Sequence, residues 1–450
     1  MRPSAPTARQ LARSVLDRIA RTRAFPNRVL SAALDRAAHL SSADRALTTE
    51  LVYGVLRREA RLDRALESLA TRGLRDLDPR VRTALRVAAY QVLFLDRVPP
   101  YAAVNDGVEA CKAARGRGMA GLANALLRRL VDRGEPPLPG AAEDPLGHLV
   151  EASGLPEWLA RLALAELPDG EAIPFVEALS RPAPLALRAN TLRTDRATLR
   201  ARLLQERPNA SLDPSPIAAD ALLARHIDAP FATAAWKEGL FGVEDVGAQV
   251  VGDLCGAAAG EHIWDACAGL GGKTAHLAAL AGNRATIDAT DIAPRKLAQA
   301  RETWSRLHVK GVTTRARDLM AAPAEPPRFH RVLVDAPCSG LGVLRRHPEA
   351  AARRDPADIA ALAARQRLML GSAAAAVLPG GSLVYAVCTF DRAECDDVIA
   401  AFLDEHADFR VEPPAGARWD GLRDWRGFVR TWPHRHDADA FFAVRLRRQE

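Results

Sequence analysis

Two of the six cysteines lie where a thiol could take part in a reaction. Cys338 follows one short apolar run and Cys388 ends the next, and the carboxyl ends of neighbouring parallel strands meet at one edge of a sheet. A thiolate in such a pocket can attack an electrophilic ring carbon once nearby cations or dipoles lower its pKa. Arg345, Arg346 and His347 follow the first thiol closely and could supply that charge.

For any single cysteine the alternative is a structural one, because free cysteine is a common small core residue. We keep that interpretation for the remaining four, which are Cys111, Cys255, Cys267 and Cys395. The sequence contains no C-x-x-C pair, which argues against a zinc knuckle and against a disulfide framework. We therefore expect no metal site and a reducing, cytoplasmic environment.

A glycine-rich turn lies between an apolar run and a helical pattern in residues 263–274. Glycines let the backbone approach a ligand closely, and the amides at a helix start favour a carboxylate or phosphate. The predicted cofactor-binding residues of this turn are Cys267, Ala268, Gly269, Leu270, Gly271, Gly272 and Lys273, the last of which can add a point charge. The turn is not a Walker P-loop, because Cys267 stands where the first glycine is required.

Acidic residues follow three successive predicted strands. Asp291 ends the second strand, Asp318 follows the third and Asp335 ends the fourth. An acid at the end of the second strand binds ribose hydroxyls in dinucleotide folds and also in methyl-donor folds. The row of acids predicts a cofactor lying across the switch point of the sheet, although an Asp at a strand end can also be a helix N-cap.

Beyond about residue 236, short apolar runs alternate with helical patterns. The predicted strands are 262–267, 285–290, 312–315, 331–334 and 382–387, and the predicted helices between them include 274–281, 294–307 and 357–377. Strand–helix–strand units at this spacing indicate a doubly wound α/β sheet of parallel strands.

The rest of the chain divides into two further parts. Residues 7–133 are helical nearly throughout, with six or seven helices, whereas 157–235 mix helical patches with one strand-like run. We predict an all-α domain in 1–133, a linker and small α+β subdomain in 134–235, and a Rossmann-like domain in 236–450. No run of about 18 apolar residues occurs, so we expect no membrane span.

The positive charge is concentrated in the first third of the chain. Residues 1–134 hold 25 Lys and Arg against 13 Asp and Glu, a balance of +12, while the remaining residues carry −5. High-GC codon usage would explain the preference for Arg over Lys, but not this asymmetry. A basic module on a slightly acidic body suggests nucleic-acid binding by the N-terminal domain.

Taken together, these residues resemble the NOL1/NOP2/Sun family of RNA cytosine-5 methyltransferases over about residues 180–450. The matching segments are 185–192, 241–249, 265–274 with Asp291, 335–342 with 346–348, 385–389 with Glu394, and 439–443. The most specific of these is the run Asp-Ala-Pro-Cys-Ser-Gly at 335–340 combined with a second cysteine after the next strand. Residues 98–108 and 122–129 resemble the helical RNA-binding domain of the antitermination factor NusB.

The resemblance implies a reaction and a role for each site residue. A NusB-like domain fused to this catalytic unit is similar to bacterial enzymes that methylate a cytosine of small-subunit (16S) ribosomal RNA. By that resemblance Cys388 adds to carbon-6 of the cytosine, Asp335 holds or protonates the ring nitrogen, and Cys338 assists release. The implied cofactor is S-adenosyl-L-methionine (AdoMet), and the implied partner is ribosomal RNA, free or partly assembled, with the base swung out of its stack.

Three positions depart from the family pattern. Leu270 replaces the proline of the glycine loop, which leaves that loop more flexible, and Thr389 replaces the serine after the second thiol. Cys395 stands where the family has an asparagine.

Other functions stay open at this point. The chain could be a non-catalytic RNA-binding or ribosome-assembly factor, or could methylate another RNA such as tRNA. An amino-group methyltransferase would favour an aromatic residue in the turn after the fourth strand, where this chain has Cys338. A generic Rossmann dehydrogenase would leave the paired thiols unexplained. We expect a monomer that has no membrane partner.

Overall fold

The computed structural model describes residues 1–450 except 1–4, 23, 71–72, 322–325 and 327. By its contacts the chain divides into two compact units. Unit 1 comprises Met1–Ser180 and His347–Arg353, and unit 2 comprises Arg181–Arg346 and Arg354–Glu450. Within the described residues, no helix is both long and apolar enough to cross a membrane.

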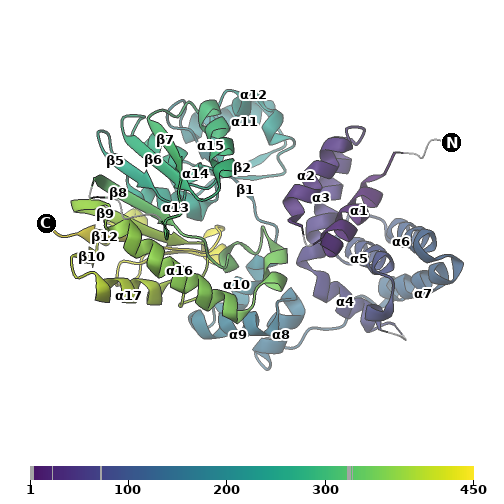
Figure 1. The fold of residues 1–450 in the computed structure, drawn as a ribbon. Helices are drawn as coiled ribbons and strands as arrows, with labels where there is room; N and C mark the ends of the chain where they lie inside the picture. The colour runs from purple at the N-terminus through teal and green to yellow at the C-terminus, as the bar shows by residue number, and fades with distance from the viewer. Residues whose placement is uncertain (1–4, 23, 71–72, 322–325, 327) are drawn as a thin grey trace. The chain divides into compact units, whose positions relative to one another are not determined.

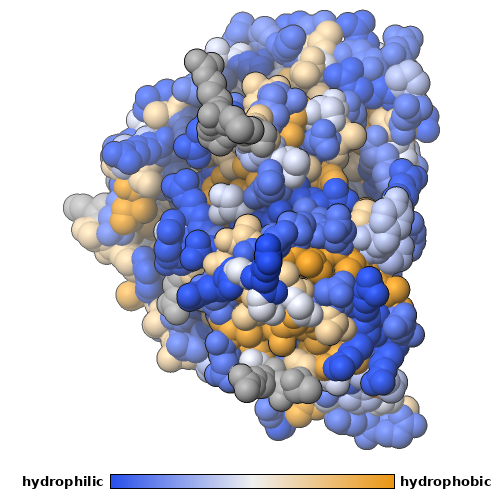
Figure 2. All heavy atoms as spheres, turned by 90° about the vertical axis from the view of Figure 1, so that its right-hand side faces the viewer, coloured by the Kyte–Doolittle hydropathy of each residue, from blue (hydrophilic) through white to orange (hydrophobic). Residues whose placement is uncertain are grey.

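Unit 1 is helical, which the sequence predicts for 1–133, while the helices within 145–179 fall in the stretch that it assigns to a linker and a small α+β subdomain. Its helices are α1 (Ala8–Thr22), α2 (Pro26–Arg36), α3 (Ser42–Arg57), α4 (Glu59–Glu67), α5 (Pro79–Phe94), α6 (Pro100–Arg115), α7 (Arg117–Arg133), α8 (Pro145–Ser153), α9 (Glu157–Glu166) and α10 (Ala172–Leu179). The core of α1–α7 is formed by fully buried apolar side chains such as Leu51, Leu85 and Leu127, each of which contributes roughly 1.5–3 kcal/mol by burial. Figure 2 shows hydrophilic residues over much of one face of the molecule, with hydrophobic residues gathered mainly in its lower half.

Local signals set the ends of these helices. Asp78 accepts a hydrogen bond from the amide of Arg80 and so caps α5, and Pro79 occupies the first turn, where its missing N–H costs nothing. The segment His347–Arg353 contains a short 3-10 helix, and its Arg353 guanidinium donates to the carbonyl of Ala24 at 2.9 Å.

A small antiparallel sheet opens unit 2, in the order β2-β3-β1-β4. Its strands are β1 (Leu185–Ala189), β2 (Ser211–Pro214), β3 (Ala221–Arg225) and β4 (Phe241–Val243), with α11 (Arg196–Glu206) and α12 (Ala234–Lys237) between them. The sequence predicts a small α+β subdomain here. Only the first of its strands has a clear sequence signal.

The large sheet has eight strands in the order β10-β12-β9-β8-β5-β6-β7, with β11 paired to β12 (Figure 1). The strands are β5 (His262–Asp265), β6 (Thr286–Asp291), β7 (Val312–Ala316), β8 (Phe329–Asp335), β9 (Val377–Val387), β10 (Phe409–Val411), β11 (Val429–Thr431) and β12 (Phe441–Arg448). The first five run parallel, as predicted. The last three pair antiparallel, so the sheet is mixed.

Helices cover both faces of this sheet (Figure 1). They are α13 (Val246–Cys255), α14 (Gly272–Leu280), α15 (Pro294–Arg306), α16 (Pro356–Ala374) and α17 (Asp396–Glu405). One further short helix, α18 (Pro433–His436), lies before β12. Successive strand residues face opposite layers: on β8, Leu333 packs with α13 and α14, while Val332 and Val334 pack with α16 and α17. The sheet is thereby fixed on both sides, and its carboxyl edge carries the candidate site.

Candidate active site

The two thiols predicted to act together are in contact. The sulfur atoms of Cys338 and Cys388 lie 3.3 Å apart, and both residues are half-buried. Cys388 directly follows β9, and Cys338 lies three residues beyond the end of β8, its parallel neighbour. Next to the thiols, the hydroxyl of Ser339 donates to that of Thr389 at 2.9 Å. The two strand ends therefore present paired side chains, as the topology predicts.

The two thiols share a hydrogen bond in which either sulfur can be the donor. The hydrogen bond to Cys388 and burial together raise the pKa of the Cys338 thiol well above its ordinary value. A thiol whose pKa is raised is a weaker candidate for the nucleophile and a better candidate for a proton donor.

Lys273 supplies a cation close enough to Cys388 to interact with it electrostatically. Its ammonium lies 2.7 Å from Oδ2 of Asp335. Burial opposes the charge of Lys273, but the carboxylates of Asp335 and Glu244 outweigh burial and raise its pKa, with a further contribution from Cys388. The sequence interpretation assigns Lys273 to an anionic group of the cofactor. In the structure its ammonium is paired with Asp335 instead.

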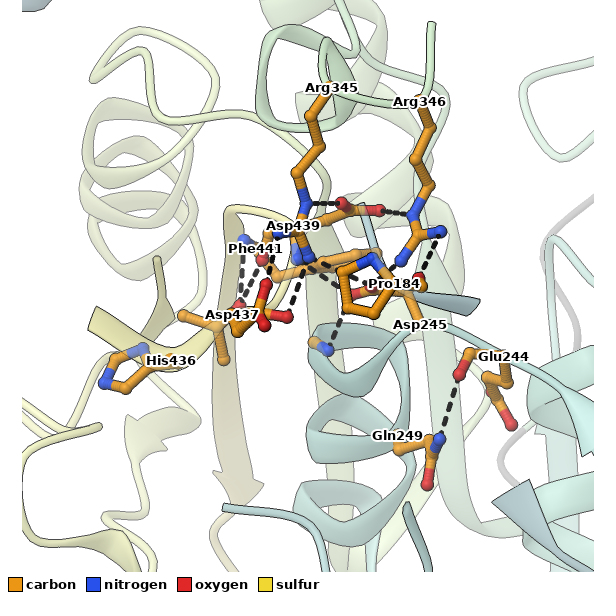
Figure 3. Close-up of polar contacts among 12 residues, drawn as sticks. Pro184, Glu244, Asp245, Gln249, Arg345, Arg346, His436, Asp437, Asp439 and Phe441 are labelled. Atoms are coloured by element: carbon orange, nitrogen blue, oxygen red, sulfur yellow. Dashed lines mark hydrogen bonds and ion pairs between the residues drawn. The ribbon is translucent and has the colours of Figure 1, made fainter. Parts of the chain in front are cut away.

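The side chains expected to bring positive charge to the Cys338 thiol bind acidic residues instead. The guanidinium groups of Arg345 and Arg346 bind aspartates (Figure 3), and His347 lies 3.5 Å from Glu349. The prediction that these three residues supply positive charge to the thiol is therefore wrong. Sequence proximity is a poor guide here, because the aspartates are about 90–100 positions away.

The glycine loop between β5 and α14 has a conformation that needs glycine. Gly271 has φ of 81°, and a Cβ at this position would meet the Trp304 indole at 2.5 Å. The same indole donates from Nε1 to the carbonyl of Gly271 at 2.8 Å. Gly269 has φ of 56°, and its amide donates to Oδ2 of Asp291 at 3.0 Å. Trp304 on α15 and Asp291 on β6 thus hold the loop.

Asp265 anchors the start of α14 from the end of β5. Its Oδ2 accepts a hydrogen bond from the Thr274 hydroxyl at 2.6 Å, whereas its Oδ1 is buried with no hydrogen-bond partner among the described residues. Burial raises the pKa of Asp265 to about 7. An unsatisfied acceptor beside a glycine loop marks a place where a polar ligand group can bind.

The acids at the other strand ends are bound to nearby amides. Asp291 accepts from the amides of Gly269 and Ala293, and Asp318 accepts from the amide of Met320 at 3.0 Å. Asp318 therefore acts within its own turn, whereas Asp291 also holds the glycine loop, and α15 has Ala293, not Asp291, at its N-cap position. Neither arrangement excludes a further contact, because a carboxylate has about four acceptor positions.

Sequence reasoning named Leu270 at this edge but missed two further apolar side chains, those of Ile292 and Met320. Leu270, Ile292 and Met320 follow β5, β6 and β7, and they are 59%, 63% and 37% exposed. Large apolar side chains open to solvent beside polar strand ends are typical of a ligand site. For Ile292 the available signal is its position directly after Asp291.

Glu394 holds the Cys338 loop through hydrogen bonds. Its Oε1 accepts from the amide of Ser339 at 2.9 Å and from Nε2 of Gln366 at 2.8 Å, and the residue is fully buried. Cys395, which replaces the family's asparagine, is buried, and burial raises its thiol pKa well above the ordinary value. Cys267, by contrast, lies in the loop at intermediate exposure, and burial of its thiol also raises its pKa.

Among the residues that the structure describes, no group of three or more His, Cys, Asp or Glu could hold a metal ion.

Comparison with known proteins agrees with this geometry. Residues 256–447 match the family described as 16S rRNA methyltransferase RsmB/F, residues 6–132 match the NusB family, and residues 155–227 match the ferredoxin-like domain of RsmF/B-like methyltransferases. A Bacillus subtilis protein named "Probable ribosomal RNA small subunit methyltransferase B" is 32% identical, over 98% of this chain and 99% of its own length. The chain belongs to the RsmB/F family.

Other relatives of this RsmB/F member agree. The ribosomal RNA small subunit methyltransferase B of Xanthomonas campestris is 33% identical over 90% of this chain and 89% of its own. The crystal structure titled PH0851 has a TM-score of 0.80 at 23% identity and covers 99% of both chains, which shows the same fold. NSun6 from Pyrococcus horikoshii, solved with SFG, has a TM-score of 0.59 at 20% identity, covering 66% of this chain and 98% of its own. The predicted family and the NusB-like domain are confirmed.

Proposed function

We propose that this RsmB/F family member transfers a methyl group from AdoMet to carbon-5 of a cytosine in 16S ribosomal RNA, with Cys388 as the nucleophile. The observation that carries the proposal is the thiol pair, whose sulfur atoms lie 3.3 Å apart and in which the pKa of Cys338 is raised. One thiol can add to the pyrimidine ring and the other can act in its release, with the Lys273–Asp335 pair nearby. The family and the names of its relatives support the substrate.

The residues at the sheet edge fit the proposed cofactor. Gly269 and Gly271 allow a close backbone approach, and the unsatisfied Oδ1 of Asp265 can accept a hydrogen bond from a ligand. The exposed side chains of Leu270 and Ile292 offer an apolar surface for an aromatic ring such as adenine. We propose that Cys267, Ala268, Gly272, Asp291 and Asp318 complete this site around the loop.

In the proposed reaction the thiolate of Cys388 adds to carbon-6 of the flipped-out cytosine and forms a sulfur–carbon bond. Asp335, held by Lys273, binds or protonates the ring nitrogen, so the electron pair of the former double bond becomes available at carbon-5. AdoMet, when bound, would supply the methyl group to carbon-5: its sulfur–methyl bond would break, the electron pair would stay on the donor sulfur, and the neutral thioether S-adenosylhomocysteine would leave.

Release reverses the addition. A base removes the proton from carbon-5, the double bond to carbon-6 forms again, and the sulfur–carbon bond breaks with its electron pair returning to Cys388. The thiol of Cys338 lies 3.3 Å from that sulfur and can stabilise the departing thiolate by donating its hydrogen bond. This gives the two cysteines different roles.

The basic N-terminal part, in the proposal, binds RNA around the target base. Residues 1–134 carry a balance of +12, and phosphate neutralisation by Arg is the main source of such affinity. We propose the domain boundaries 1–133, 134–235 and 236–450. We also propose that the protein acts as a monomer in the cytoplasm, on free or partly assembled small-subunit RNA.

The decisive experiment compares Cys388→Ala with Cys338→Ala in methyl transfer from labelled AdoMet to small-subunit ribosomal RNA. We expect Cys388→Ala to be inactive and to form no covalent protein–RNA complex on a denaturing gel. We expect Cys338→Ala to accumulate that complex, because addition proceeds and release does not. The opposite pattern would reverse the two roles, and undetectable AdoMet binding by calorimetry would favour a non-catalytic RNA-binding factor.

A further inference from the structure

Four buried or partly buried side chains form an ion-pair cluster next to the thiols, which we call the Arg–Asp clamp: Asp245, Arg345, Arg346 and Asp439 (Figure 3). Nε of Arg345 lies 2.9 Å from Oδ1 of Asp439, and Nε of Arg346 lies 2.8 Å from its Oδ2. Nη2 of Arg346 reaches Oδ2 of Asp245 at 2.7 Å. One carboxylate therefore binds the side chains of two consecutive arginines.

The clamp joins three segments that are far apart in the chain. Asp245 follows β4, the arginines end the loop that carries Cys338, and Asp439 precedes β12. Asp439 also donates its amide to Oδ1 of Asp245 at 3.0 Å, and Nη1 of Arg346 donates to the carbonyl of Pro184 at 3.1 Å. Asp439 is only 2% exposed, so its charge depends on these partners.

Backbone contacts lead from the clamp to Cys388. The amide of Gly342 donates to the carbonyl of Cys388 at 3.0 Å, and the amide of Ala440, next to Asp439, donates to the carbonyl of Gly342 at 3.0 Å. A Cβ at Gly342 would lie 2.0 Å from the Ala440 oxygen and 2.9 Å from the Cys388 oxygen. The Cys338 loop thus packs at Gly342 against the backbone of Cys388. The clamp residue Asp439 is adjacent in sequence to Ala440, which binds the same glycine.

The two arginines of the clamp are paired with its two aspartates, and Arg345 also lies 2.9 Å from Asp437. Asp437 in turn binds Arg225, which lies 3.4 Å from Asp213. Lys273, whose ammonium pairs with Asp335, is not part of this cluster. Because the arginines of the clamp are already paired, the clamp acts on the Cys338 loop through geometry and not by supplying charge to the thiols.

We propose that Arg346 and Asp439 are positioning residues, which keep the Cys338 loop in register with Cys388 for the release of the methylated base. The inference rests on the proposed function. Addition needs Cys388 alone, which β9 holds in the sheet through its pairing with β8 and β12. Release needs both thiols in contact, and the Cys338 loop has left the sheet at Asp335. Loosening the clamp therefore slows release more than addition.

The test uses the full-length protein and Arg346→Lys, which keeps the charge but removes the planar fork that reaches three partners. We expect covalent protein–RNA complex to form at nearly the wild-type rate and to persist about tenfold longer. In Arg346→Lys/Cys338→Ala, the complex persists no longer than in Cys338→Ala alone, because both changes remove the same contact.

Two further variants keep the test sharp. The matched control is Asp408→Asn. This change removes an ion pair with Arg448 at the end of β12, the strand that Asp439 precedes. We expect it to leave the lifetime of the complex unchanged. Asp245→Asn keeps an oxygen for the amides of Asp439 and Gly247 and weakens the contact to Arg346 together with the longer one to Arg345. It replaces Arg346→Lys if that variant melts early.

The outcomes separate the clamp from the proposed function. A wild-type lifetime of the complex in a folded clamp variant overturns the clamp proposal alone. The clamp proposal is also overturned if the complex of Arg346→Lys/Cys338→Ala lasts several-fold longer than that of Cys338→Ala. The clamp would then act on something other than Cys338. Absence of any complex in Cys338→Ala overturns the proposed function and the clamp proposal with it.

Discussion

At the scale of single residues, the sequence and the structure suggest different partners for Lys273. Its ammonium is buried against Asp335, whereas the glycine loop alone suggests a contact to the cofactor. We therefore propose that Lys273 acts toward the base and the nucleophile, since Asp335 is the residue proposed to bind the ring nitrogen.

Replacing Lys273 by Met tests this assignment. We expect methyl transfer to fall about 100-fold, because an ammonium in a buried site stabilises the developing charge strongly. AdoMet affinity, measured by calorimetry, should stay close to that of the wild type. If Lys273→Met loses AdoMet binding while methyl transfer at saturating AdoMet is retained, then Lys273 belongs to the cofactor site after all.

Asp265 gives a prediction about pH. Its pKa is raised to about 7 by burial, from an ordinary value of 3.8, so folding favours its protonated form. The stability that this group contributes is present below about pH 4 and is lost as the pH rises through 7. The wild type should therefore lose about 2–3 kcal/mol between pH 5 and pH 8 that Asp265→Asn does not lose. Urea unfolding at the two pH values measures this, and equal pH slopes would contradict it.

At the scale of elements, the turn between β5 and α14 depends on two glycines to different degrees. In Gly271→Ala the new Cβ would lie 2.5 Å from Trp304 at a φ of 81°, whereas in Gly269→Ala it would meet only a carbonyl at 3.9 Å. We expect Gly271→Ala to cost about 2–3 kcal/mol of stability and Gly269→Ala about 1 kcal/mol. Thermal melting and AdoMet titration of the two variants should rank them in this order, and a reversed rank would show that Trp304 does not hold the loop.

The sequence predicts the elements whose signals are local. Most of the parallel strands β5–β9 contain short apolar runs with turn residues between them, although β7 is largely polar and exposed. Cys338 and Cys388 can be placed side by side from strand order alone. The partners of Arg345 and Arg346 cannot be predicted in this way, because they are chosen by tertiary contacts across about 90–100 residues. The exposure of Ile292 is missed for a related reason, since tertiary packing decides whether an apolar side chain is covered.

At the scale of the whole molecule, the chain separates the groups proposed for chemistry from the groups proposed for RNA affinity. The thiols, Lys273 and the glycine loop all lie in unit 2, while the excess positive charge lies in the helices of unit 1. Charge in a helical module affects mainly the affinity for RNA and its salt dependence, and leaves the rate at the bound base largely unchanged.

Two arginines on α7 test this separation. Arg117 and Arg128 are exposed, and changing both to Gln should weaken binding of small-subunit ribosomal RNA and lower the slope of log K against log salt by about 1–2. The methylation rate at saturating RNA should not change, because neither residue is in the unit that holds the thiols. Arg410→Gln, an exposed arginine of unit 2, is the matched control. A slope unchanged by the double variant would show that α7 does not contact phosphate, and a lower rate at saturation would show that the two functions are not separate.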